Sequence, residues 1–186
     1  MLQLILLLSL LLSGLACQGG AQPAVQKAAT PGPAEAVPPD TVITLERTIC
    51  YGMCPDYKIT IYGDGRLIYE GRKFVKVEGT VNDTVTREQL GQLIAEFEKA
   101  DYFSLRDSYR RSDDGCPTFW TDNPSANTSI QLDGRRKSIA HYYGCQEEGE
   151  GYKVYPQKLY TLESRIDEIV NSARWVKRDD EEKKSR

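Results

Sequence analysis

Two hairpin patterns, each followed by a helical pattern, constrain the fold of this chain more than any other feature of its sequence. The first hairpin spans residues 57–71 and turns at Gly63–Gly65, and the second spans residues 127–143 and turns at Asp133 and Gly134. Apolar and polar residues alternate along both segments, which is the period of a strand with one buried face. Gly-Asp-Gly and Asp-Gly accept the backbone conformations of tight hairpin turns. The pattern therefore predicts two antiparallel strand pairs.

An amphipathic helix is predicted after each hairpin. Thr86 and Gln89 have the spacing of a capping box, which marks a helix start. Pro156 suits the first turn of the second helix. The apolar stripes of the two helices are Leu90, Leu93, Ile94, Phe97 and Ala100, and Leu159, Leu162, Ile166, Ile169 and Ala173.

These elements favour an α+β fold, in which both helices pack on one face of an antiparallel sheet. Residues 41–47 and 73–81 supply further strands. The two hairpin–helix units are weakly similar to one another. A parallel βαβ fold needs helices as crossovers between successive strands, and the two hairpins disfavour it.

Four segments of the chain differ in composition. Residues 1–17 form an apolar run of signal-peptide length, and their Gly-Leu-Ala-Cys end resembles the lipobox of bacterial lipoproteins. Residues 18–39 are rich in Ala and Pro and predict a disordered tether. Residues 177–186 predict a charged, disordered tail. Residues 40–176 remain as one domain, long enough for a single core.

Cys17 is the predicted site of lipid attachment, so we expect a lipid-anchored protein of the bacterial cell envelope, facing the periplasm or the cell surface. The alternative is an ordinary cleaved signal, because Gly14 replaces the usual Leu and the opening residues lack Lys and Arg. The formal net charge is −3 and the basic residues are scattered. A nucleic-acid partner is therefore not expected.

The remaining four cysteines leave three interpretations of the Cys50-x-x-x-Cys54-Pro motif. A thioredoxin-like centre places its thiolate at a helix start, but a strand pattern follows Cys54. The motif also resembles the copper site of Sco-type chaperones, in which a histidine joins two thiolates, and His141 is the only histidine. Disulfides are favoured, because a signal-bearing chain enters an oxidising compartment and four cysteines form an even set.

Three disulfide pairings are possible, and the favoured one joins Cys50 to Cys54 and Cys116 to Cys145. The first link closes a tight turn, and the second pins a long loop to the end of a strand. In the chain-entropy model these links contribute roughly 2 and 3.5 kcal/mol. No cofactor and no metal is then expected, and copper on Cys50, Cys54 and His141 is the alternative.

Four stretches occur in order along the chain: CYGMCPDYKITIYGDGRLIYEG, FEKADYFSLRD, GCPTFWTDNPS and ARWV. Together they resemble the family known as domain of unknown function 6438, over about residues 41–176. The resemblance implies a secreted or lipoprotein module, in which the Cys-x-x-x-Cys-Pro turn is a unit independent of the later cysteine pair. It implies no activity.

The segment 108–126 has no sustained period, and loops of this length are either functional or disordered. It carries Phe119 and Trp120, and Cys116 would hold it in place. We expect a recognition surface of aromatic and basic side chains here. The candidate binding residues are Arg110, Arg111, Phe119, Trp120, Tyr142 and Tyr143. The alternative is a small satellite core beneath the loop.

Calcium is a further candidate ligand of this loop. Asp113, Asp114, Asp122 and Asn123 offer oxygen ligands, but their order matches no EF-hand spacing. Formation of turns by these residues is the favoured explanation.

Enzyme motifs are few in this sequence. It contains no Gly-x-Ser-x-Gly motif and no Gly-rich phosphate loop after a strand, and one histidine cannot build a metal triad. The predicted function is therefore non-enzymatic binding of another envelope protein or a surface ligand. The alternative is copper or redox handling through Cys50, Cys54 and His141.

Overall fold

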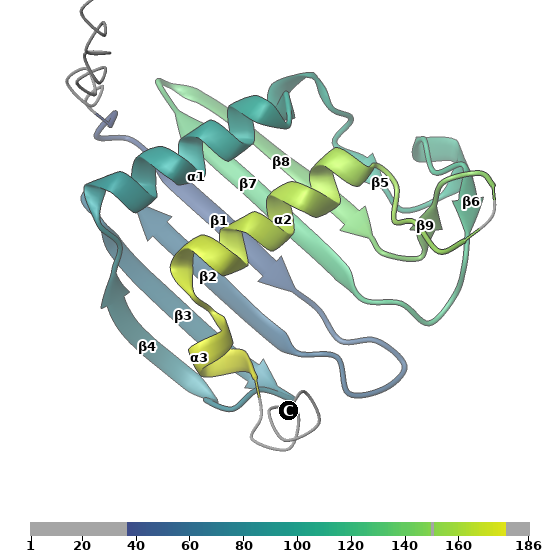
Figure 1. Ribbon diagram of the computed structural model, residues 1–186, viewed down its shortest axis with the longest axis horizontal. Helices are drawn as coiled ribbons and strands as arrows, with labels where there is room; N and C mark the ends of the chain where they lie inside the picture. The colour runs from purple at the N-terminus through teal and green to yellow at the C-terminus, as the bar shows by residue number, and fades with distance from the viewer. Residues whose placement is uncertain (1–36, 150, 178–186) are drawn as a thin grey trace, which may run out of the picture. The chain divides into compact units, whose positions relative to one another are not determined.

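A seven-stranded sheet with two long helices on one face forms the body of the domain (Figure 1). The computed structural model describes residues 37–149 and 151–177. The predicted signal segment, lipid site at Cys17 and most of the tether and tail lie outside the described residues. Among the described residues, no helix is long and apolar enough to cross a membrane. The strands of the sheet are β1 (Val42–Arg47), β2 (Asp56–Tyr62), β3 (Arg66–Lys73), β4 (Gly79–Thr84), β5 (Ser108–Tyr109), β7 (Ser125–Leu132) and β8 (Arg135–Tyr142).

The strand order is β4-β3-β2-β1-β7-β8-β5, which makes β1 the central strand. Val42 of β1 pairs with Tyr62 of β2 on one side and Gln131 of β7 on the other. The strand pairs are antiparallel, except for the short parallel contact of β5 with β8. Both predicted hairpins are confirmed as the β2–β3 and β7–β8 pairs. Asp133 and Gly134 have positive φ angles of 50° and 71°, the left-handed backbone that an Asp-Gly hairpin turn requires.

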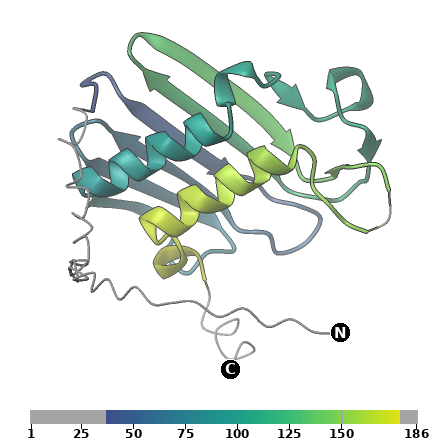
Figure 2. The ribbon, with the colours of Figure 1, turned by 45° about the horizontal axis from the view of Figure 1, so that its top comes forward.

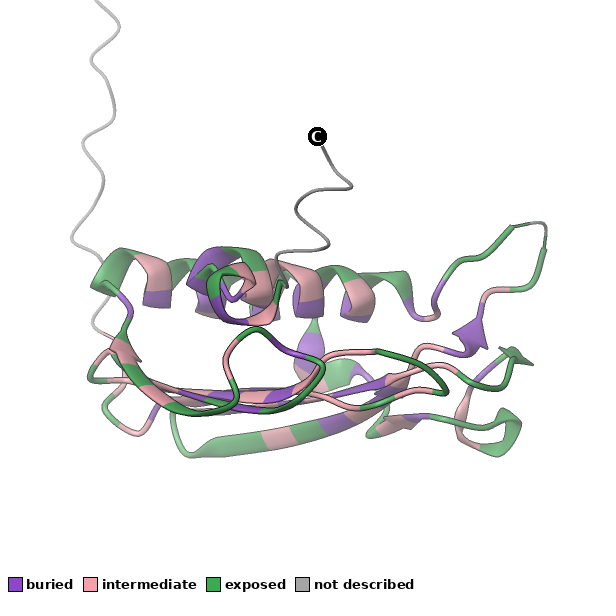
Figure 3. Ribbon diagram, turned by 90° about the horizontal axis from the view of Figure 1, so that it is seen from below, coloured by how far each residue is buried: buried purple, intermediate pink, exposed green. Residues whose placement is uncertain are grey.

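Two helices, α1 (Arg87–Lys99) and α2 (Gln157–Val170), lie side by side on one face of the sheet, and in the described part of the chain the opposite face carries no α-helix (Figures 2 and 3). The capping box predicted for α1 is confirmed, with hydrogen bonds in both directions between Thr86 and Gln89. The α+β fold class is therefore confirmed. The buried core includes Ile43, Leu45, Ile59, Ile61 and Leu67 from the sheet, Leu90, Leu93 and Phe97 from α1, and Leu159, Leu162 and Ile166 from α2.

A short third helix, α3 (Ala173–Val176), follows α2. The sequence predicts Ala173 on the stripe of the second helix, but α2 ends at Val170 because Asn171 adopts a left-handed φ of 53°. The break turns the chain back onto the sheet. There Trp175 stacks on the buried Tyr69, with ring centroids 4.9 Å apart.

The strand predicted at residues 73–81 begins only at Gly79 in the structure. Phe74 has a left-handed φ of 56°, which ends β3 and starts a loop. The loop packs on α3, where the Val77 amide donates a hydrogen bond to the carbonyl oxygen of Trp175 at 2.9 Å. Its alternating valines therefore cover the edge of the core instead of extending the sheet.

The long segment 108–126 contains regular pieces that its sequence does not indicate. After β5 come a single 3₁₀ turn, η2 (Ser112–Asp114), and the strand β6 (Thr118–Phe119). β6 pairs with β9 (Cys145–Gln146) in a separate two-stranded sheet. Another 3₁₀ turn, η1 (Tyr102–Ser104), follows α1. Strands β5, β6 and β9 lie together near the N-terminal end of α2 (Figure 1).

Candidate functional site

An open pocket of about 620 Å³ lies between the long segment and the end of β8. We call it the loop pocket. Its lining residues are Ser108, Arg110, Arg111, Asp113, Asp114, Phe119 and Tyr142. Phe119 stacks on Tyr142, with ring centroids 5.2 Å apart and the ring planes 29° from parallel. Phe119 is still 50% exposed and Trp120, the next residue, is 59% exposed. The loop pocket thus presents aromatic surface beside two exposed guanidinium groups.

Asp114 organises the backbone of the loop pocket. Its carboxylate accepts hydrogen bonds from Ser108 Oγ at 2.5 Å and from the amides of Arg110 and Arg111 at 2.8 Å each. Burial raises the pKa of Asp114, but the hydrogen bonds from Ser108, Arg111 and Arg110 outweigh it and lower the pKa below its usual value of 3.8. This carboxylate is therefore a structural acceptor that holds the loop.

The predicted disulfide between Cys116 and Cys145 is confirmed and joins the long segment to β9, with the Cα atoms 5.4 Å apart. Close by, the Trp120 amide donates to the carbonyl oxygen of Gly144 at 2.8 Å. A Cβ atom on Gly144 would lie 2.0 Å from the Trp120 carbonyl oxygen, so only glycine allows this approach. The disulfide and this backbone hydrogen bond together fix the backbone around Phe119 and Trp120.

The predicted disulfide between Cys50 and Cys54 is also confirmed, and it closes the loop between β1 and β2, with the Cα atoms 5.5 Å apart. The copper alternative would need both thiolates beside His141. The structure instead engages both ring nitrogens of His141, with Glu163 and with the backbone of Tyr155. Within residues 37–149 and 151–177, no group of three or more His, Cys, Asp or Glu side chains is placed to hold a metal ion.

A second polar cluster is buried between α2 and the sheet. His141 of β8 and Glu163 of α2 are both fully buried, and His141 Nδ1 lies 2.9 and 3.0 Å from the two carboxylate oxygens. His141 Nε2 donates to the carbonyl oxygen of Tyr155 at 3.0 Å. Because a carbonyl oxygen only accepts, Nε2 carries a proton, and a further proton is held between Nδ1 and the carboxylate. The Tyr143 hydroxyl donates to Glu163 Oε2 at 2.8 Å.

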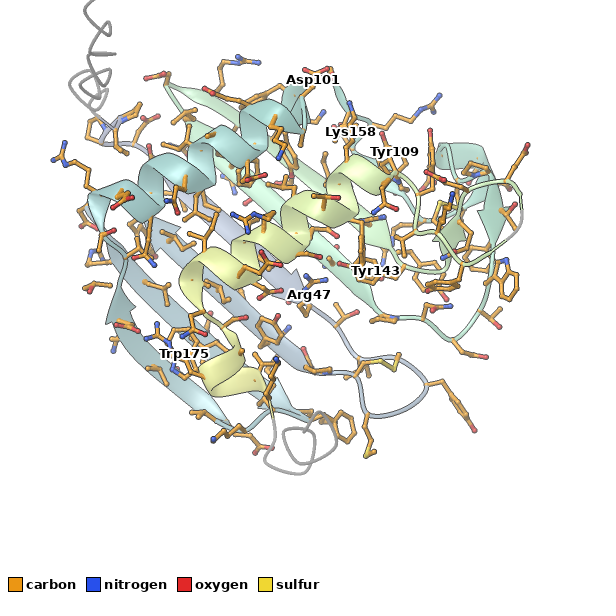
Figure 4. All side chains as sticks on the ribbon, viewed as in Figure 1. Arg47, Asp101, Tyr109, Tyr143, Lys158 and Trp175 are labelled. Atoms are coloured by element: carbon orange, nitrogen blue, oxygen red, sulfur yellow. A yellow bond between two sulfur atoms is a disulfide. The ribbon has the colours of Figure 1, made fainter. Side chains whose placement is uncertain are left out.

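Arg47 extends this cluster to Asp167, one turn further along α2. Its Nε and Nη2 donate to Asp167 Oδ2 at 3.2 and 2.8 Å, and its Nη1 donates to the Tyr143 hydroxyl oxygen. The hydroxyls of Tyr57 and Ser172 donate to Asp167 Oδ1 at 2.7 and 2.6 Å. Arg47 and Tyr143 lie beside one another at the flank of α2 (Figure 4). We call the set the α2 network: Arg47, Tyr57, His141, Tyr143, Glu163, Asp167 and Ser172.

The electrostatics of the α2 network keep its phenols protonated and its guanidinium charged. Burial raises the pKa of Tyr143, and Glu163 raises it further. Burial and Asp167 raise the pKa of Tyr57 in the same way. Burial lowers the pKa of Arg47, but Tyr143 and Asp167 outweigh burial, so that this pKa lies well above its usual value. Both phenols therefore act as hydrogen-bond donors to carboxylates.

Tyr143 is the one predicted binding residue that the structure places away from the exposed aromatic surface. Successive residues of a strand point to opposite faces. Tyr142 therefore stacks on Phe119, whereas Tyr143, which follows it, enters the α2 network. The structure does bring Arg110 and Arg111 together with Phe119 and Tyr142 around the loop pocket.

The four calcium candidates lie in two places. Asp113 and Asp114 line the loop pocket, and Asp114 is already engaged by its own loop. The amide of Asn123 donates to the Tyr142 hydroxyl at 3.0 Å. Asp122 has a left-handed φ of 66°, a conformation that Asp adopts more readily than most residues.

The sequence-based interpretation missed Arg47, Glu163 and Asp167. Glu163 and Asp167 are four residues apart, so they lie on one face of α2, and Glu163 is fully buried there. His141 comes two residues after Ile139 and therefore shares its covered face. A histidine and a carboxylate at core positions of a strand and a helix were the available signal of a buried pair.

A family model for a domain of unknown function (DUF6438) matches residues 41–170. No curated protein matches the chain. The matched residues contain both disulfides, the whole lining of the loop pocket and all of the α2 network except Ser172. These features therefore belong to one family domain.

Replacing Glu163 with Ala should lower the free energy of unfolding by roughly 3–5 kcal/mol, because His141 and Tyr143 lose their acceptor in a fully buried place. Urea unfolding followed by circular dichroism measures the change. Glu168→Ala is the matched control on the same helix, since the Glu168 side chain is 61% exposed and pairs with Arg165 at the surface. It should change stability by at most about 1 kcal/mol. Equal effects of the two changes would contradict a structural role for the α2 network.

Replacing Asp114 with Ala should destabilise the loop by about 1–3 kcal/mol, because a hydroxyl and two amides lose a charged acceptor. Hydrogen exchange of the loop amides measures this, with Asp113→Ala as the neighbouring control. Because the folded pKa of Asp114 is lowered, its contribution is complete above the usual value of 3.8 and is lost as the pH falls through the folded pKa. Wild type and Asp114→Ala should therefore converge at low pH; a constant difference would count against this role.

Proposed function

We propose that this chain, which belongs to the DUF6438 family, is a non-enzymatic binding module of the bacterial cell envelope, lipid-anchored at Cys17. The proposed partner is another envelope protein. The surface that contacts it is centred on Phe119 and Trp120 beside the loop pocket. The anchor rests on the sequence, and the binding surface rests on how exposed apolar side chains are distributed over the domain.

The exposed large apolar side chains of the described residues all lie on loops and short elements at one end of the main sheet, the end where β1 finishes. They are Ile49, Tyr51, Met53, Phe74, Phe119, Trp120 and Tyr152. We call this the exposed end. Scattered apolar residues are ordinary on a protein surface, but their gathering at one end indicates an interaction site. This distribution is the observation that carries the proposal.

The described chain begins at the opposite end of the sheet. There Asp40 accepts a hydrogen bond from the Gly134 amide at 2.8 Å, and the Thr41 carbonyl oxygen accepts one from the Gly63 amide at 2.8 Å. Gly63 and Gly134 belong to the turns of the two hairpins, which point away from the exposed end. The chain therefore enters the domain at the end of the sheet opposite the exposed end, so its entry leaves the apolar loops uncovered.

The loop pocket has the features of an interface hot spot. Trp and Tyr are enriched at such positions, and Arg is the third enriched type. Phe119 and Tyr142 are already stacked, and the Cys116–Cys145 disulfide holds the segment that carries them. Ordering that is complete before binding does not oppose association.

Replacing Trp120 with Ala should weaken partner capture by about 2 kcal/mol, or roughly thirtyfold, because an exposed indole is lost from the centre of the surface. The full-length protein is used to capture its partner from envelope extract, and the affinity for the purified partner is then measured for both forms. Tyr62→Ala is the matched control, since it removes an aromatic ring at the opposite end of the sheet. The melting temperature should hardly change. Unaltered capture, or unfolding of the Trp120→Ala protein, would refute the assignment.

Replacing Cys17 with Ser should move the protein from the membrane fraction to the soluble fraction, because the proposed acyl chains lose their attachment site. Fractionation of cells followed by immunoblotting measures the distribution. Ser9→Ala, within the same apolar run, serves as the control and should leave the protein in the membrane fraction. If the Cys17→Ser protein stayed with membranes, the anchor would have to be sought elsewhere.

A further inference from the structure

A second, smaller pocket of about 270 Å³ opens at the exposed end, between the loop that follows β1 and the C-terminal part of α2. Its walls include two prolines, two tyrosines and the disulfide-bonded Cys54. We call it the proline pocket. Its lining residues are Arg47, Thr48, Cys54, Pro55, Tyr57, Pro124, Ser125, Tyr143, Asp167 and Val176. None of them lines the loop pocket. The proline pocket is therefore a separate feature of the same end.

The polar groups of the proline pocket with unused bonding capacity are donors. A guanidinium has five N–H groups, and Arg47 uses three of them, two on Asp167 and one on Tyr143. The hydroxyl of Ser125 makes no hydrogen bond to another described residue, although its backbone amide donates to Thr48 Oγ1 at 3.0 Å. The Tyr57 and Tyr143 hydroxyls already donate to carboxylates. A ligand that accepts hydrogen bonds could therefore pair with the unused N–H groups of Arg47 and with the Ser125 hydroxyl, which form the floor of the pocket.

The charge of the floor favours a neutral acceptor over an anion. Asp167 Oδ2 lies 2.8 Å from Arg47 Nη2, so the guanidinium already has its counter-charge. A carboxylate ligand would lie beside the Asp167 carboxylate with no unpaired cation to compensate it, whereas the carbonyl of an amide carries no net charge.

The size and the walls of the proline pocket indicate which chemical group the ligand carries next to its carbonyl. Pockets for drug-sized ligands have volumes of about 300–1,000 Å³, so 270 Å³ suits one apolar side chain with its adjoining amide. Beside the pocket, the Cys50–Cys54 loop carries Ile49, Tyr51 and Met53, which are 50%, 90% and 67% exposed. Such a loop supplies further contact area for a chain that runs across it.

We propose that the proline pocket binds a segment of a partner polypeptide, taking one aliphatic side chain between Pro55, Pro124 and Val176, while Arg47 and Ser125 donate hydrogen bonds to its main-chain carbonyl oxygen. The chain's own tail, KRDDEEKKSR, follows Val176 but contains no apolar residue to enter the pocket. The site is distinct from the surface around Trp120. A negative result at the proline pocket would therefore leave the proposed function unaffected, and a negative result for Trp120 would leave the proline pocket unaffected.

The test uses N-acetyl-L-leucinamide as the probe and the full chain, labelled with ¹⁵N. Saturable shifts of the Thr48 and Ser125 amides and of Arg47 Nε–H are expected, with a dissociation constant in the millimolar range, as suits a ligand of this size. N-acetylglycinamide, which lacks the side chain, and N-acetyl-L-leucine, which carries a carboxylate, should each bind at least about fivefold more weakly. No saturable shift, or tighter binding of the carboxylate, would overturn the proposal.

Val176→Phe should weaken binding of N-acetyl-L-leucinamide at least tenfold, because Val176 lines the pocket and the larger side chain fills it. Val37→Phe is the matched control, since Val37 is also partly buried and lines a pocket at the opposite end of the sheet. Binding that survives Val176→Phe would overturn the assignment, as would a wild-type dimer that this change converts to a monomer, because a second copy would then be the occupant. If Val176→Phe fails to fold, the comparison of the three probes on the wild type decides alone.

Discussion

The placement of the fully buried Glu163 and the partly buried Asp167 against the sheet is the constraint on which the arrangement of this domain depends. An unpaired carboxylate in such a place is strongly unfavourable, so α2 can dock only where His141, Tyr143, Arg47 and Tyr57 meet its two acids. The partners come from β1 and β2, which are consecutive in the chain, and from β8 and the residue after it, which come much later. Apolar packing alone would let α2 slide along the sheet, whereas these directional bonds allow one position. That position in turn places α3, and with it the loop before β4.

Much of the fold followed from local patterns in the sequence. The hairpins, the capping box at Thr86 and the two apolar stripes are set by interactions within a few residues, and they were found where they were expected, except that α2 ends before Ala173. The loop before β4 was missed because valines alternate there as they do in a strand, and only the contact of Val77 with Trp175, a residue nearly a hundred positions later, decides the outcome. Alternation measures which side chains are buried, and a loop packed on a helix buries them as well as a strand does.

The candidate sites were predictable to a lesser degree. The composition of the long segment indicated an exposed aromatic surface, and the structure places Phe119 and Tyr142 in one stack. Tyr143 was grouped with them by proximity in sequence, although the period of a strand sends neighbours to opposite faces. Glu163 and Asp167 were not identified from the sequence, because their partners lie on strands whose pairing a single sequence does not reveal. Long-range polar contacts of this kind depend on the complete fold and produce no periodic pattern in the sequence.

The position of β1 has a mechanical consequence. The described chain enters the sheet directly at this central strand, and every residue from Val42 to Arg47 is paired with both β2 and β7. Hydrogen bonds between antiparallel strands run perpendicular to the strand direction, so tension applied at the N-terminal side and resisted at the exposed end would load both ladders in shear at the same time. Strands peeled from an edge would instead lose their bonds one by one. The pairing of β1 therefore makes the sheet resistant to tension along the axis that joins its N-terminal side to its apolar loops.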